Sequence, residues 1–158
     1  MPTQAWERAN DDRDDPVVRC DLDTTPFREV RRLVRGLLVD RGDVVVEDAT
    51  LIADELVSNA HQHAPGPRMC RLSLLDHGRY LRIEVEDASP APPRIRAPDA
   101  RGGRGMVLID QLASSWGVEH HDHHKTVWAH LRLDRAGSNS RARHLALAPR
   151  WPLSGVEQ

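Results

Sequence analysis

The chain has 158 residues, which is enough for one ordinary domain and too few for two. Its residues are 39% hydrophobic and 29% charged, with a formal net charge of -2, so no overall positive field favours nucleic acid or an anionic membrane. No segment approaches the ~20 apolar residues that a membrane span needs, and no basic stretch followed by an apolar run marks a secretory signal. We therefore expect a cytoplasmic protein without nucleic-acid or membrane partners.

Along the chain, the first expected elements are one strand and two helices. Residues 1–16 are acidic and nearly free of aliphatic side chains, which predicts a disordered arm. Residues 17–22 form a plausible strand. Residues 26–38 carry apolar side chains at helical spacing beside a broad arginine face, and a second helix is expected from about residue 45 to residue 63, where "APGP" stops it.

The second half of the chain is mostly strand. Residues 70–75 and 80–86 alternate between apolar and polar side chains about the turn "DHGR", which predicts a hairpin. The stretch "ASPAPPRIRAPDARGGRG" has the prolines and glycines of an irregular loop, and a loop this long is usually functional or disordered. A short helix "MVLIDQLA", two strands about "DHHK" and a mobile tail from residue 134 complete the chain.

These elements predict the fold class. Strands connected mainly through hairpins exclude a doubly wound parallel sheet. We expect an α/β two-layer sandwich in residues 17–133, in which about three helices cover one face of a mixed, mostly antiparallel sheet.

The stretch "DELVSNAHQHA" places polar side chains where a helix should be apolar. Glu55, Asn59 and His63 are four residues apart, so they form one row along the helix. The positions beside this row are apolar and should face the sheet. Burying polar groups at the rim of a core is costly unless they have a task, although polar rims are also common in ordinary amphipathic helices.

A second set of candidate residues follows the hairpin. Asp87 ends the strand "LRIEVED", and the irregular loop closes on "GGRGM" at the start of a helix. Glycines there allow backbone N–H groups to approach an anion, and a helix N-terminus favours negative charge. Together with an amide and a carboxylate on a facing helix, this pattern suggests a site for nucleotide phosphates.

Four ordered motifs resemble those of the GHKL, or Bergerat-fold, ATPases. "ELVSNAHQHA" resembles the N-box E-x-x-x-N-A-x-x-H-A, "VEDASPAPP" the first glycine box, "RGGRGMVLID" the second glycine box, and "KTVWAHL" the final strand with its threonine. The resemblance covers about residues 17–133. The most similar subgroup is that of small bacterial ATP-binding proteins related to anti-sigma-factor serine kinases.

The resemblance implies a role for each matching residue. Asn59 would be the Mg²⁺ ligand and Glu55 the general base. Asp87 would accept a hydrogen bond from the adenine amino group, and Thr126 would support the adenine end. The remaining implied nucleotide-binding residues are Arg101, a lid arginine, His63 of the N-box, and Gly103 and Gly105, whose amides would bind phosphate.

The chain also departs from the family pattern. Ser89 stands where the first glycine box has its first glycine, and His124-Lys125 replaces the glycine that often precedes the threonine strand. Both changes fall in the nucleotide pocket, so they bear on nucleotide affinity and on catalysis.

The resemblance implies ATP and Mg²⁺ as ligands and phosphate transfer to a serine of a regulatory partner, which would be an anti-sigma antagonist or a sigma factor. The partner would contact the first helix and the lid, and a homodimer is compatible with the sequence. The alternative is a regulatory module of the same fold that binds nucleotide or protein without catalysis. A third interpretation is a metal-binding protein centred on the histidines of residues 120–124, although an exposed turn is the preferred explanation because adjacent side chains diverge in a hairpin turn.

Overall fold

The computed structural model describes residues 16–89 and 104–134, and the structural statements below concern these residues. The predicted arm, most of the predicted loop and nearly all of the predicted tail lie outside them. The elements in chain order are β1 (Val17–Asp21), α1 (Phe27–Leu37), α2 (Asp43–His63), β2 (Met69–Leu75), β3 (Tyr80–Asp87), α3 (Arg104–Leu112), β4 (Ser115–His120) and β5 (Lys125–Arg132). This order is the one expected from the sequence.

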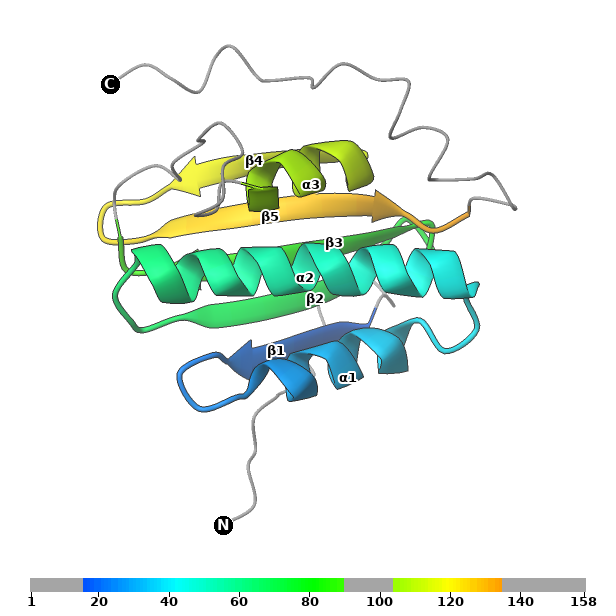
Figure 1. Cartoon of the computed structure of the whole chain (residues 1–158), viewed down its shortest axis with the longest axis horizontal. Coiled ribbons are helices and arrows are strands. Elements are labelled where there is room, and N and C mark those ends of the chain that lie inside the picture. The colour runs from blue at the N-terminus through cyan, green and yellow to red at the C-terminus, as the bar shows by residue number, and fades with distance from the viewer. Residues whose placement is uncertain (1–15, 90–103, 135–158) are drawn as a thin grey trace.

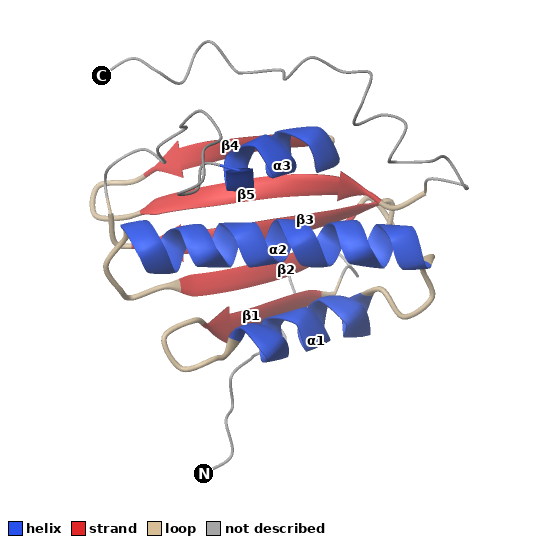
Figure 2. Cartoon of the chain, in the orientation of Figure 1, coloured by secondary structure: helices blue, strands red, loops and turns tan. Residues whose placement is uncertain are grey.

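The five strands form one open sheet in the order β1-β2-β3-β5-β4. Every neighbouring pair is antiparallel, so the described sheet contains no parallel pair. The three helices lie on the same face of this sheet, with α2 along its middle, α1 beside β1 and α3 beside β4 and β5 (Figures 1 and 2). The predicted two-layer α/β sandwich is therefore confirmed.

The core lies between α2 and the central strands. Alternation along β3 and β5 turns one set of apolar side chains toward the helices, and these are almost completely buried: Leu81, Ile83, Val85, Val127, Ala129 and Leu131. From α2, Ile52 and Leu56 meet them, and Ala49, Ala53 and Ala60 are small enough to let the helix approach the sheet closely. This packing fixes the rotation of α2 about its axis, and with it the direction of the polar row.

The other face of the sheet carries a polar and aromatic network in place of helices. The Arg82 guanidinium lies 4.9 Å from the ring centroid of Trp128 and donates to Glu84 over 3.0 Å. Gly117 leaves room for this tryptophan, because a Cβ atom there would lie 2.9 Å from Trp128 Cζ2.

In residues 16–89 and 104–134, no helix has both the length and the apolar character needed to cross a membrane.

Cys20 and Cys70 are opposite each other on β1 and β2. Both are free, and both are buried on the helix-facing side of the sheet. They act there as small apolar residues of the core.

Candidate functional site

One end of the sandwich gathers the residues that the sequence singles out. The last turn of α2, the end of β3 and the beginning of β5 lie at the same end of the molecule, and α3 begins nearer its middle, beside α2 (Figure 1). Because β3 and β5 are antiparallel, the last residue of β3, Asp87, is directly opposite the first residue of β5, Lys125. The fold thus brings together segments that are far apart in the sequence.

The polar row of α2 lies at the rim of the core. Glu55 and Asn59 are half-buried, and His63 is exposed in the last turn. The Asn59 amide nitrogen is 3.5 Å from the sulfur of Met106 in the first turn of α3, so it connects the two helices. This contact engages the nitrogen end of the amide, and the oxygen end is the one that a cation would bind.

Glu55 has the electrostatic character of a proton acceptor. Its partial burial, and secondly the negative charge of Asp54, raise the pKa of the Glu55 carboxyl above its usual range. Asp54 itself accepts from Arg31 Nε over 2.9 Å and 3.0 Å, which ties α2 to α1. A carboxylate with a raised pKa, one helical turn from Asn59, is a stronger proton acceptor than an ordinary glutamate.

Asp87 is buried at the end of β3 and held from two sides. The backbone N–H of Ser89 donates to its Oδ1 over 2.9 Å, and Lys125 Nζ lies 3.3 Å from its Oδ2. The first contact turns the chain away from the sheet directly after the strand. Ser89, at the position of a family glycine, is therefore compatible with this turn, and it is buried as well.

Lys125 is the site residue that the sequence did not predict. Thr126, the residue predicted to support the base, pairs with Glu86 and Glu119, on the opposite face of the sheet from Asp87. Lys125 takes the place beside Asp87 instead. The signal that could have found it is the alternation along β5: Val127 faces the helices, so the residue two before it must face them too.

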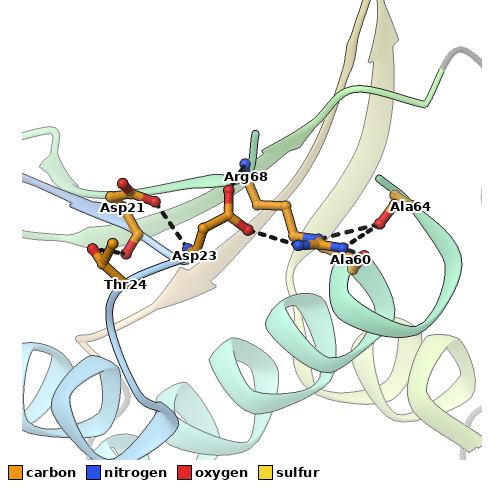
Figure 3. A network of polar contacts seen from close by, with 6 residues as sticks. All are labelled: Asp21, Asp23, Thr24, Ala60, Ala64 and Arg68. Carbon is orange, nitrogen blue, oxygen red and sulfur yellow. Dashed lines mark hydrogen bonds and ion pairs between the residues drawn. The ribbon is translucent and has the colours of Figure 1, made fainter. Parts of the chain in front are cut away.

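The last turn of α2 is fixed in place by Arg68 (Figure 3). Its guanidinium donates to the carbonyl oxygens of Ala60 and Ala64 at the end of the helix, with distances from 2.6 Å to 3.2 Å. The Ala60 oxygen also accepts the backbone N–H of Ala64 over 3.1 Å. The same guanidinium donates to Asp23 over 2.6 Å. This bond, and the backbone N–H of Arg68, hold the pKa of Asp23 below its usual range. One arginine thus joins the end of α2 to the loop between β1 and α1.

Some predicted residues cannot be placed in the site. Arg101 and Gly103 lie outside the described residues, and Gly105 belongs to the first turn of α3.

In the histidine-rich turn, the rings of His121 and His124 stack with centroids 4.3 Å apart. Across residues 16–89 and 104–134, the His, Cys, Asp and Glu side chains include no group of three or more arranged to hold a metal ion.

Comparisons with known proteins identify the family of the chain. Residues 4–131 match the family model of the histidine kinase-like ATPase domain. The uncharacterized protein SCO4941 of Streptomyces coelicolor is 34% identical over 71 residues, which span 42% of this chain and 67% of that protein.

A solved structure shows a similar fold. The RsbU and RsbW domains of Rv1364c from Mycobacterium tuberculosis match with a TM-score of 0.57 at 20% identity, over 77% of this chain and 33% of that one. The present chain therefore spans about a third of that longer protein, and the likeness concerns the fold. Because the family model covers most of the sequence and the fold agrees, the chain belongs to the histidine kinase-like ATPase domain family, whose name implies ATP as the ligand.

Proposed function

We propose that this protein binds Mg-ATP and transfers its terminal phosphate to a serine of a regulatory partner protein. The observation that carries the proposal is the gathering of a carboxylate with a raised pKa, a half-buried amide and a buried aspartate at one end of the sandwich. Family membership supports ATP as the ligand, and the N-box resemblance supports the roles of the residues on α2.

The residues on α2 would perform the chemistry. Asn59 would hold Mg²⁺ through its amide oxygen, a donor that this ion takes, and Glu55 lies one helical turn away as the proposed general base. Bound there, Mg²⁺ would neutralise phosphate charge. The serine oxygen would form a bond to the terminal phosphorus as the bond from that phosphorus to the bridging oxygen breaks, and ADP would leave. Glu55 would accept the serine proton.

At the other end of the nucleotide, Asp87 would accept a hydrogen bond from the adenine amino group. A buried carboxylate with fixed orientation discriminates well between bases, because a base that offers no donor adds no hydrogen bond there and still displaces water from the carboxylate. The predicted phosphate contacts of Arg101, Gly103, Gly105 and His63 belong to the same proposal.

The partner surface is proposed on α1. Its outward residues include Arg28, Arg32 and Arg35, with Phe27 exposed beside them. A positively charged helix face with one aromatic side chain fits an acidic protein surface. The resemblance to anti-sigma-factor serine kinases makes an antagonist protein with an acceptor serine the first partner to test.

The test has two stages. Calorimetric titration of the full chain with ATP, with and without Mg²⁺, should show binding that strengthens with the metal, and no binding at millimolar ATP would contradict the proposal.

The second stage tests phosphate transfer. The wild type and Glu55→Gln are each incubated with Mg-ATP and a bound partner, and mass spectrometry detects serine phosphate. Transfer should slow by roughly 10²-fold or more in the variant, the usual scale for loss of a general base. ATP binding without transfer to any bound partner would instead establish the non-catalytic module.

A further inference from the structure

The only lysine of the chain lies at the buried end of the nucleotide site. Lys125 and Asp87 are directly opposite each other on β5 and β3, next to the pair Val127 and Val85. Since directly paired residues share a face, and alternate pairs along two strands share it too, both side chains are on the helix-facing side of the sheet. The ammonium group is thus placed in the layer between α2 and the sheet.

This ion pair differs from the others in the described residues. The side chains of Lys125 and Asp87 are 6% and 3% exposed, and both side chains of every other ion pair in the described part of the chain are at least 16% exposed. A buried ion pair is weak evidence for a stabilising role, because two apolar residues of similar size often do as well or better. A function in recognition accounts for keeping both charges there.

The contacts that the pair makes within residues 16–89 and 104–134 leave some of its hydrogen-bonding capacity unused. An ammonium group carries three N–H donors, and one carboxylate oxygen at 3.3 Å accepts at most one of them. A carboxylate has about four lone-pair directions, and the contacts with Ser89 and Lys125 take two of them. The two side chains can therefore present one donor and one acceptor side by side to a third group.

Adenine offers the complementary pattern on one edge, where the amino group at position 6 is a donor and the neighbouring ring nitrogen N1 is an acceptor. We propose that Lys125 is a base-recognition residue, which donates to N1 while Asp87 accepts from the amino group. This inference rests on the proposed binding of ATP. It adds Lys125 to the residues of the adenine end, where the resemblance implied a supporting role for Thr126.

The proposal also predicts which purine is rejected. Hypoxanthine, the base of ITP, carries a carbonyl oxygen at position 6 and an N–H at position 1, so donor and acceptor are exchanged. In the same pose, that oxygen would meet the Asp87 carboxylate and the N–H would meet the Lys125 ammonium. Both contacts are repulsive, so ITP should bind much more weakly than ATP.

Ligand analogues test this on the wild-type protein. The Mg²⁺ complexes of ATP, 1-deaza-ATP, which lacks only the N1 acceptor, and ITP are titrated by calorimetry. ATP should bind at least about 10-fold more tightly than 1-deaza-ATP, the effect of one hydrogen bond to a charged group. Equal affinity for ATP and 1-deaza-ATP would overturn the role of Lys125 and leave ATP binding intact. No binding of ATP would overturn both proposals.

The single lysine allows a direct reading of the contact. Labelling with ¹⁵N-lysine gives one side-chain signal in the NMR spectrum, which should shift on saturation with Mg-ATP and shift much less with Mg-1-deaza-ATP. In Lys125→Met, the ratio of the two affinities should fall to about one, whereas Arg79→Met, which removes an exposed charge at the far end of the hairpin, should keep it. The wild-type measurements decide the question if Lys125→Met fails to fold. An unchanged ratio in a folded Lys125→Met would contradict the proposal.

Discussion

At the scale of single residues, the proposed metal ligand is the most direct target. Asn59→Ala removes the amide oxygen, so it should abolish most of the Mg²⁺-dependent gain in ATP affinity, by roughly 10-fold or more if one metal ligand is lost. The fold should survive because the side chain lies at the rim of the core. Calorimetry with and without Mg²⁺ measures the gain. Ser58→Ala, one position earlier on α2, is the matched control, and an unchanged gain in Asn59→Ala would exclude the assignment.

Glu55 should also have a measurable cost in stability. Its pKa is raised in the folded protein, mainly by burial, so the folded state binds this proton more tightly than the unfolded chain does. The free energy of unfolding must then fall as the pH rises from the ordinary carboxyl range through the pKa that Glu55 has in the folded state. Above that pKa, the cost in stability is fully present. Glu55→Gln removes the charge, so the variant should be more stable than the wild type at about pH 8 and equal to it below about pH 4.

Thermal unfolding at a series of pH values measures this difference. Glu47→Gln, on the exposed side of α2, controls for the loss of one negative charge from the same helix. A wild type more stable than Glu55→Gln at about pH 8 would contradict the idea that burial of the carboxylate dominates.

At the scale of elements, the end of α2 depends on Arg68. Arg68→Ala removes the donors to the carbonyls of Ala60 and Ala64, so the free energy of unfolding should fall by about 1.5–3 kcal/mol, the range for hydrogen bonds with a charged partner. Urea denaturation measures the change. Arg79→Ala removes a mostly exposed arginine and should change stability by only about 0.5 kcal/mol or less. Equal effects of the two substitutions would show that Arg68 does not anchor the helix.

The contact of α2 with the sheet can be tested with two neighbouring residues. Ile52 is fully buried and Leu51 is 37% exposed. Ile52→Ala should cost about 2–5 kcal/mol of unfolding free energy because it leaves a cavity in the core, and Leu51→Ala should cost much less. Denaturant titration of both variants measures the difference. Similar costs would mean that α2 is rotated about its axis from the orientation described, and the polar row with it.

At the scale of the whole molecule, the fold follows from local patterns in the sequence. Periodicity of two gave the hairpin strands and periodicity of 3.6 gave α2, and hairpin connections predicted an antiparallel sheet. The pairing of β3 with β5 could not be read in the same way, because either of the last two strands could lie beside β3. Local periodicity carries no information about which of the two does.

The candidate site, like the fold, could be predicted only in part from local sequence patterns. Spacing along one helix was sufficient to group Glu55 with Asn59. The neighbour of Asp87 required the register between two distant strands, and a shift of one residue there exchanges Lys125 for Thr126 because successive side chains face opposite sides. Motif resemblance located the strand correctly, and alternation decided which of its residues faces the helices.

The insertion of β5 between β3 and β4 has a consequence for how the chain folds. The β2–β3 hairpin closes across a short turn, whereas the pairing of Asp87 with Lys125 must close the whole segment from Ala88 to His124, which costs more chain entropy. We expect the β2–β3 hairpin to form early in refolding. The pairing of Asp87 with Lys125, at the proposed base-binding end of the site, should form late. In stopped-flow refolding, the ability to bind a fluorescent ATP analogue should therefore return after the far-ultraviolet circular dichroism signal, and simultaneous recovery would show that the sheet closes in a single step.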